Sequence, residues 1–275
     1  MNQDRFLDIY KKERLRACQL KQVAILERID RICKKHGIDY WLDGGTLLGA
    51  VRHGGFIPWD DDIDVAMKKE DLPRFMAATE TELPASLVLQ LPEDKHDSQS
   101  VIKIRDLNSF FISRDDDLSK SYPKGVFVDI FPFVDYPSVG KKWIRFVAKG
   151  ICASHAVLTR KHSYSLYNTM AFFYFECRYL LCRILWFLSR LLRPCDKYLS
   201  NTLHNNWYGI MHEKKAVFPT REIMFEGKTF MAPADPDRYL RDLYGEYMTL
   251  PPEEKRISHA LYFTPELIVN QEKQL

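Results

Sequence analysis

The stretch WLDGGTLLGAVRHGGFIPWDDDIDVAM, from Trp41 to Met67, places a glycine-rich turn shortly before a run of aspartates. Asp62 and Asp64 flank Ile63, and alternate residues of a strand point to the same side, about 6–7 Å apart at Cα. Two carboxylates on one face supply the hard oxygen ligands that Mg²⁺ or Mn²⁺ prefers. The pattern therefore predicts a metal site, although a solvated acidic turn would have the same composition.

The glycine-rich turn lies between a short predicted strand, residues 38–42, and a predicted helix over 46–52. Glycine permits close approach of the backbone to a ligand, and free N–H groups at a helix N-terminus bind phosphate. A tight turn alone would explain the two glycines, but such a turn followed by an Asp-x-Asp strand is a rarer combination. We therefore expect Gly44, Gly45 and Thr46 to contact substrate phosphate.

A third carboxylate comes from the run KGVFVDIFPF, where Asp129 is surrounded by apolar residues. An unpaired charge in such a strand would be costly. A buried aspartate held by backbone hydrogen bonds is one explanation. Because the first two parts of the site are present, we favour a metal ligand or a catalytic base.

The order of helical and strand-like segments predicts an α/β fold with a mixed sheet. Residues 15–36 have the apolar spacing of an amphipathic helix, and β-branched and aromatic runs predict several strands before residue 136. We divide the chain into a catalytic core over 1–136, a helical region over 137–214, and a segment over 215–275 that completes the catalytic domain.

The helical region contains an apolar segment, residues 169–193, that is long enough to span a bilayer but carries several charges. Glu176, Arg183 and Arg190 recur every seven residues and so share one side of a helix. A basic amphipathic helix of this kind suits a membrane interface. A helix packed on the catalytic domain, with its arginines in water, fits equally well, and a true membrane span fits less well than either.

Composition and charge bear on three properties: binding to nucleic acid, the state of the cysteines, and the cellular compartment. A formal charge of +3 over 275 residues, without a long basic stripe, does not indicate a nucleic-acid partner. The six cysteines lack metal-like spacing and are expected to be reduced thiols. The charged first residues predict no signal peptide, so we expect a cytoplasmic protein. Peripheral contact with the inner face of the cytoplasmic membrane, through residues 169–193, stays an alternative to packing of that segment on the core.

The sequence DGGTLLGAVRHGGFIPWDDDIDVAM resembles the signature of the LicD family, which belongs to the nucleotidyltransferase fold superfamily and is related to fukutin proteins. The similarity continues through KIRD (103–106) and FVDIFPF (127–133), and resumes at FEGKTFMAP, YLRDLYGEYMTLPP and His259. The wide spacing between Gly45 and Asp62 is typical of LicD-like proteins. The resemblance implies a nucleotidyltransferase-like fold with an additional helical region.

The resemblance also implies a reaction. A phospho-substituted alcohol, most often phosphocholine, would pass from a CDP-activated donor such as CDP-choline to a glycan hydroxyl. The acceptor would be a cell-surface glycan, such as lipopolysaccharide, teichoic acid or capsule, or its lipid-linked precursor. Asp62 and Asp64 would hold Mg²⁺ or Mn²⁺ on the diphosphate, with Asp129 completing the site or accepting the proton of the hydroxyl.

Three basic residues are candidates for contact with the diphosphate: Arg52, Lys103 and Arg105. Arginine suits bidentate phosphate contact, and lysine supplies a point charge. For each residue, a plain surface charge is the competing explanation. The sequence does not determine which phosphorus of the donor is attacked. Attack on the phosphorus nearer the nucleoside would make the protein a nucleotidyltransferase that modifies a small molecule or a protein.

Overall fold

The computed structural model describes residues 3–92, 101–113, 116, 121–159, 165–256, 258 and 260–267, and the side chains from residue 13 onward. It confirms a mixed α/β fold. The helices of the described residues are α1 (Gln3–His36), α2 (Gly44–His53), α3 (Leu72–Glu82), α4 (Lys141–Leu158), α5 (Leu166–Leu192), α6 (Lys214–Val217) and α7 (Pro236–Tyr244). The strands are β1 (Tyr40–Leu42), β2 (Asp64–Lys68), β3 (Leu87–Gln90), β4 (Ile102–Asp106), β5 (Phe110–Ser113), β6 (Phe127–Tyr136), β7 (Tyr198–Asn201), β8 (His212–Glu213), β9 (Arg221–Phe225), β10 (Lys228–Ala232) and β11 (Ala260–Thr264).

The main sheet has the strand order β1-β2-β6-β4-β3, and β7 pairs with the second half of β6 and with β8. β2 and β6 run parallel, whereas the other neighbours are antiparallel. The register places Asp129 opposite Asp64 on one side and opposite Lys103 on the other. Directly paired residues of neighbouring strands point to the same face, so the sheet brings these three side chains together.

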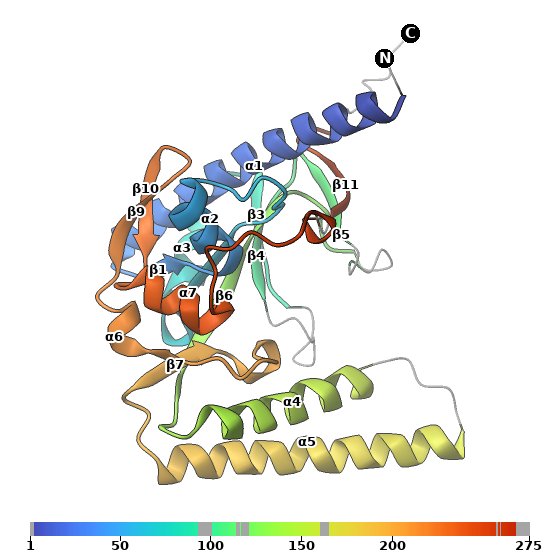
Figure 1. Cartoon of the computed structure of the whole chain (residues 1–275), viewed down its shortest axis with the longest axis vertical. Coiled ribbons are helices and arrows are strands. Elements are labelled where there is room, and N and C mark those ends of the chain that lie inside the picture. Colours follow the sequence, from blue (N-terminus) through green and yellow to red (C-terminus); the bar gives the residue numbers. More distant parts are fainter. Residues whose placement is uncertain are drawn as a thin grey trace.

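The long helix α1 covers the sheet, as Figure 1 shows. Its buried residues recur at helical spacing, with Leu26, Ile29 and Cys33 in the main core. The helix predicted over 15–36 is therefore confirmed, and it begins earlier, at Gln3. It ends where Gly37 adopts the left-handed φ of +60° that a helix C-terminus favours.

The segment predicted as helical supplies both helices and strands. Helices α4 and α5 form an antiparallel pair, and α4 lies between α5 and β7 (Figure 1). A second hydrophobic core, which includes Tyr136, Ile144, Val147 and Ile151, joins this pair to the end of β6. No helix within the described part of the chain is both long and apolar enough to cross a membrane.

The C-terminal segment packs against elements from the first half of the chain. β9 and β10 form a hairpin across Gly227, and α7 ends at Tyr244 with Gly245 as its C-cap. Helix α7 packs against α2, β10 lies beside β1, and β11 pairs with β5. The division into 1–136, 137–214 and 215–275 stays a prediction, and within it residues 198–213 add β7 and β8 to the main sheet.

Candidate functional site

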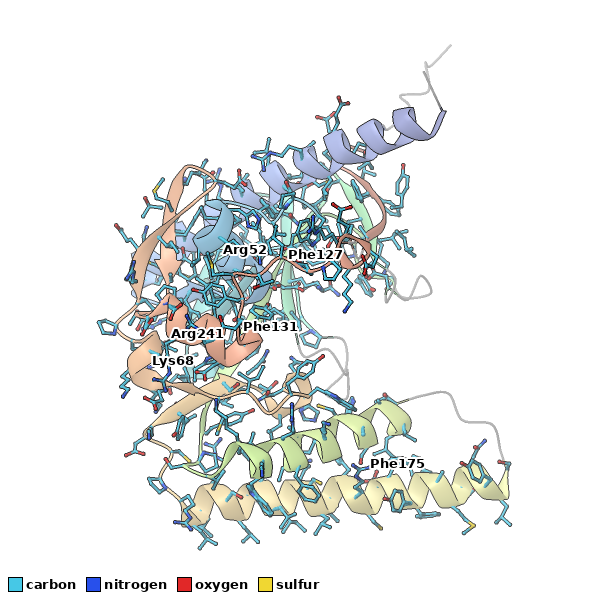
Figure 2. All side chains as sticks on the ribbon, viewed as in Figure 1. Arg52, Lys68, Phe127, Phe131, Phe175 and Arg241 are labelled. Carbon is cyan, nitrogen blue, oxygen red and sulfur yellow. The ribbon has the colours of Figure 1, made fainter. Side chains whose placement is uncertain are left out.

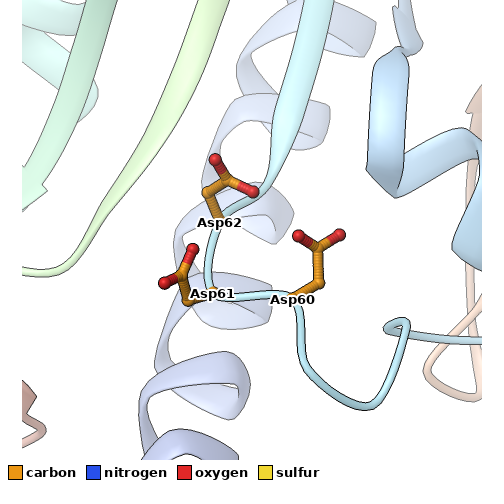
Figure 3. Close-up of side chains that lie close together, drawn as sticks. All are labelled: Asp60, Asp61 and Asp62. Carbon is orange, nitrogen blue, oxygen red and sulfur yellow. The ribbon is translucent and has the colours of Figure 1, made fainter. Parts of the chain in front are cut away.

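Three consecutive aspartates form the loop that leads into β2 (Figure 3). One side-chain oxygen from each of Asp60, Asp61 and Asp62 lies within 4.8 Å of the others. Helix α1 holds this loop from behind, since Gln19 Nε2 donates to the Asp60 carbonyl at 2.8 Å and Gln22 Nε2 donates to the Asp61 carbonyl at 2.7 Å. The loop is thus fixed through its backbone, which leaves the carboxylates to other contacts.

Asp61 differs in role from its neighbours. Its Oδ2 accepts from the Ser258 hydroxyl and, at 2.6 Å, from the backbone N–H of Ala260. The side chain is 2% exposed. Asp61 therefore anchors the start of β11, and Asp60 and Asp62 are the members of the loop that face the rest of the site.

The glycine turn makes room for two of the carboxylates. A Cβ atom on Gly44 would lie 2.8 Å from Asp64 Oδ2, and one on Gly45 would lie 2.8 Å from Asp60 Oδ2. The Gly44 N–H is bound by Asp43 Oδ1 at 2.8 Å. The N-terminus of α2 therefore faces aspartates as well as any substrate, and phosphate contact by Gly44 and Gly45 stays a prediction.

Thr46 has a partner that the sequence did not indicate. Its side chain is buried, and its Oγ1 accepts from the backbone N–H of Asp64 at 2.8 Å. The Asp43 N–H donates to the Asp64 carbonyl at 3.0 Å. The two bonds fix the first residue of β2 against the start of α2, so the structure gives Thr46 a positioning role.

We expect Thr46→Val to lower the free energy of unfolding by about 1–3 kcal/mol, because it leaves the Asp64 N–H without its acceptor. The matched variant Thr46→Ser keeps the hydroxyl and should cost less, about 1 kcal/mol for the lost methyl group. Urea unfolding of both variants measures the difference. Equal destabilisation by the two substitutions would contradict this role.

Lys103 and Asp129 form an ion pair, with Lys103 Nζ 2.5 Å from Asp129 Oδ1. Arg105 lies on the same face of β4 but is 1% exposed. Its guanidinium donates to the Gln90 side chain and, at 2.9 Å, to the Gly125 carbonyl. Of the two predicted cations on β4, Lys103 thus reaches a site carboxylate directly, whereas Arg105 has structural partners.

Arg52 lies at the other end of α2 (Figure 2). Its Nη1 donates to the Tyr247 carbonyl at 2.8 Å, so the side chain is tied to the segment that follows α7. Burial lowers the pKa of Arg52, and the nearby Tyr244 opposes that shift. Tyr244 also interacts with the site carboxylates, which places Arg52 at the edge of the site rather than within it.

The carboxylates repel one another. Burial raises the pKa of Asp64 well above its ordinary value, and the charges of Asp62 and Asp129 raise it further. Burial and the charge of Asp62 likewise raise the pKa of Asp60. Burial also raises the pKa of Asp129, against the opposing effect of Lys103. A divalent cation would relieve this repulsion, and a set of carboxylate oxygens fits Mg²⁺ or Mn²⁺.

Three site residues were not identified from the sequence. Asp43 is buried, caps α2, and accepts from the Tyr239 hydroxyl at 2.7 Å. That hydroxyl in turn accepts from Trp41 Nε1 at 3.2 Å. The Tyr244 hydroxyl would lie 3.8 Å from a Cβ atom on Gly44. The signal for both tyrosines was the motif YLRDLYGEY, which packs onto the turn as α7. His259, which is part of the family resemblance in the sequence, lies outside the described residues.

Comparison with known proteins decides the family. The family model described as LicD/FKTN/FKRP, nucleotidyltransferase domain, matches residues 37–159. Lipopolysaccharide cholinephosphotransferase LicD of Haemophilus influenzae is 30% identical over 278 residues, which cover 91% of this chain and 97% of that protein. The chain belongs to the LicD family. The resemblance predicted from the glycine and aspartate motifs is therefore confirmed.

Other LicD-family relatives match over shorter stretches. The ribitol 5-phosphate transferases FKRP of mouse and human are each 58% identical over 36 residues, which cover 13% of this chain and 7% of those proteins. All nine site residues predicted from the sequence fall within the part matched by the LicD-family model, whereas Tyr239 and Tyr244 lie beyond it.

Proposed function

We propose that the protein transfers a phospho-substituted alcohol, phosphocholine first among the candidates, from a CDP-activated donor to a hydroxyl of a cell-surface glycan or its lipid-linked precursor. The names of two relatives support the reaction type. One is a lipopolysaccharide cholinephosphotransferase, and the other is a ribitol 5-phosphate transferase. Both names describe transfer of an alcohol that carries phosphate, and the reaction proposed for this chain is of the same type.

The observation that carries the proposal is the packing of aspartates against the glycine-rich N-terminus of α2. Asp62, Asp64 and Asp129 are the proposed metal ligands, and Asp60 lies beside them at Gly45. Bound Mg²⁺ or Mn²⁺ would neutralise charge on the donor diphosphate and on the leaving group. A neutral or basic pocket would not need such a cation.

The chain's own residues have distinct proposed roles. Gly44 and Gly45 let the backbone at the start of α2 approach the diphosphate, with the Gly45 N–H as the proposed donor because Asp43 Oδ1 already accepts from the Gly44 N–H. Lys103 supplies a positive charge beside Asp129. Asp129 accepts the proton of the attacking hydroxyl, a role that suits a carboxyl group with a raised pKa. Arg52, which lies at the edge of the site, is the proposed contact for the outer part of the donor.

Attack on the phosphorus that bears choline forms a phosphodiester to the glycan and releases CMP. Attack on the phosphorus that bears cytidine would instead leave CMP on the acceptor and release phosphocholine. The second outcome is nucleotidyl transfer to a small molecule or protein, and the description of the matching family model favours keeping it as the alternative. The two reactions differ in their small product, which chromatography with mass detection identifies.

A thermal-shift titration tests the donor class. CDP-choline, CDP-ethanolamine, CDP-ribitol, CDP-glycerol, ATP and UDP-glucose are each added with Mg²⁺ and with EDTA. A donor at one hundred times its Kd should raise the Tm by about 5–10 °C, because it binds the native state alone. We expect a magnesium-dependent shift with one CDP compound. A shift with ATP or UDP-glucose alone would contradict the proposal.

A further inference from the structure

Helix α5 uses one side to pack on α4. Cys182 and Ser189 are its buried residues, and they lie seven positions apart on one side of the helix. The contact with α4 is close, since a Cβ atom on Gly150 would lie 2.2 Å from Cys182 Sγ. Ser189 Oγ accepts from Trp143 Nε1 at 2.9 Å. The side of α5 opposite to these residues therefore faces away from the protein.

That opposite side is a continuous apolar stripe. Its large residues recur at three- and four-residue steps, with Cys177 in the single gap, and each is between 46% and 68% exposed. We call these residues the outward stripe: Met170, Phe173, Leu180, Ile184, Phe187 and Leu191. Figure 1 shows α5 at the outer edge of the molecule, with α4 between it and β7. Monomeric proteins rarely leave an apolar surface of this extent in water.

The stretch of sequence that contains α4 and α5 is strongly basic. Residues 141–193 contain ten lysines and arginines and one acidic residue, Glu176, a formal charge of +9 in a chain whose total is +3. Arg183 and Arg190 are exposed, and their guanidinium groups lie 5.7 Å and 5.9 Å from the centroids of the Tyr179 and Trp186 rings. Arg190 Nη1 also donates to the Asp135 carbonyl at 3.2 Å, so Arg183 is the arginine nearer to the outward stripe. Long cationic side chains in such positions can extend from an apolar surface to charged groups.

We propose that the outward stripe of α5 lies flat in the surface of an anionic lipid bilayer. The 27 residues of α5 give a helix about 40 Å long. Its apolar side would enter the boundary between head groups and acyl chains, and the exposed Arg183 beside it would meet a lipid phosphate. The positive charge favours an anionic bilayer over a second copy of this chain, whose own α4–α5 pair would repel it. This proposal does not depend on the reaction assigned to the site.

Co-sedimentation of the full chain with vesicles tests the proposal. Wild-type protein should bind phosphatidylcholine vesicles that contain 30% phosphatidylglycerol at least 10-fold more strongly than vesicles of phosphatidylcholine alone. Phe187→Glu should weaken binding to the anionic vesicles at least 10-fold. The matched control is Met224→Glu, which charges a residue of similar exposure on β9 and should bind as wild type does. Circular dichroism confirms that both variants keep their helices.

Two results would overturn the proposal. One is equal binding of the wild type and Phe187→Glu to anionic vesicles. The other is a dimer in lipid-free sedimentation that Phe187→Glu converts to a monomer, which would assign the outward stripe to a second copy. Neither vesicle binding nor oligomeric state depends on catalytic activity. Either result would therefore contradict the membrane proposal without bearing on the proposed reaction.

Discussion

Replacing Asp64 by asparagine is expected to reduce transfer by about 10³-fold, because it removes a charge at the centre of the proposed metal site. Asp64 is the residue at which the glycine turn, the Asp60–Asp62 loop and β6 meet. The substitution changes little volume and keeps the backbone N–H that Thr46 binds. Product formation at saturating donor measures the effect, with the exposed Asp196→Asn as a matched control that should retain full activity.

The same substitution should leave the metal-free protein as stable as the wild type or about 1–2 kcal/mol more stable, because it relieves repulsion among buried carboxylates. The folded-state pKa of Asp64 lies above its unfolded value. The folded state therefore binds the proton more tightly, and stability falls as the pH rises from the ordinary aspartate range through the raised pKa. Asp64→Asn should flatten this slope in EDTA. Strong destabilisation by Asp64→Asn would contradict the charge repulsion inferred here.

Gly44→Ala is expected to reduce activity by about 100-fold, because small displacements of catalytic groups have effects of that size. Two physical causes act at this position. Gly44 has a left-handed φ of +51°, and its new Cβ atom would lie 2.8 Å from Asp64 Oδ2. Kinetic assays and thermal melts of the purified variant measure the loss of activity and the cost of the strained backbone.

Gly54→Ala separates the two causes. Gly54 ends the same helix with a φ of +70°, but its Cβ atom would meet nothing within 4 Å. The variant should lose about 1–2 kcal/mol of stability to the left-handed backbone and keep its activity. Equal loss of activity in Gly44→Ala and Gly54→Ala would show that helix stability, and not room for Asp64, explains the glycine.

The parts of the site that are local in sequence could be predicted. Ile63 is fully buried, as the alternation of Asp62, Ile63 and Asp64 predicted. The strand itself begins only at Asp64, so Asp62 lies in the loop before β2 and not on the strand face that we expected for it. The two glycines predicted a close approach of the backbone to substrate phosphate, and that contact stays a prediction. The local pattern did not indicate that aspartates 15 to 20 residues later in the sequence would lie against the same glycines.

Contacts that depend on strand register or on distant segments could not be predicted. Period-two alternation puts Lys103 and Arg105 on one face, but only the pairing of β4 with β6 sets Lys103 opposite Asp129. Gln90 and Gly125 then bind Arg105 within the fold. The contact of Tyr239 with Asp43 joins residues 196 positions apart, and no local pattern encodes it.

The side of α5 that packs on α4 could not be predicted from the sequence either. Its charges at seven-residue spacing predicted an amphipathic helix, and the helix is present. The sequence did not indicate which side would pack, because apolar residues occupy most of its circumference. Gly150 and Cys182 decide the packing, since the missing side chain lets the helices approach closely and turns the outward stripe away from α4.

Binding of Mn²⁺ followed by electron paramagnetic resonance is a direct test for a metal site formed by Asp62, Asp64 and Asp129. The six-line signal of free Mn²⁺ decreases as the ion binds, so a titration with CDP-choline present counts sites and gives their affinity. We expect a CDP-choline-dependent Mn²⁺ site in the wild type that is at least 10-fold weaker in Asp64→Asn and unchanged in Asp196→Asn. Equal Mn²⁺ binding by the wild type and Asp64→Asn would show that the carboxylates at the N-terminus of α2 do not form the metal site.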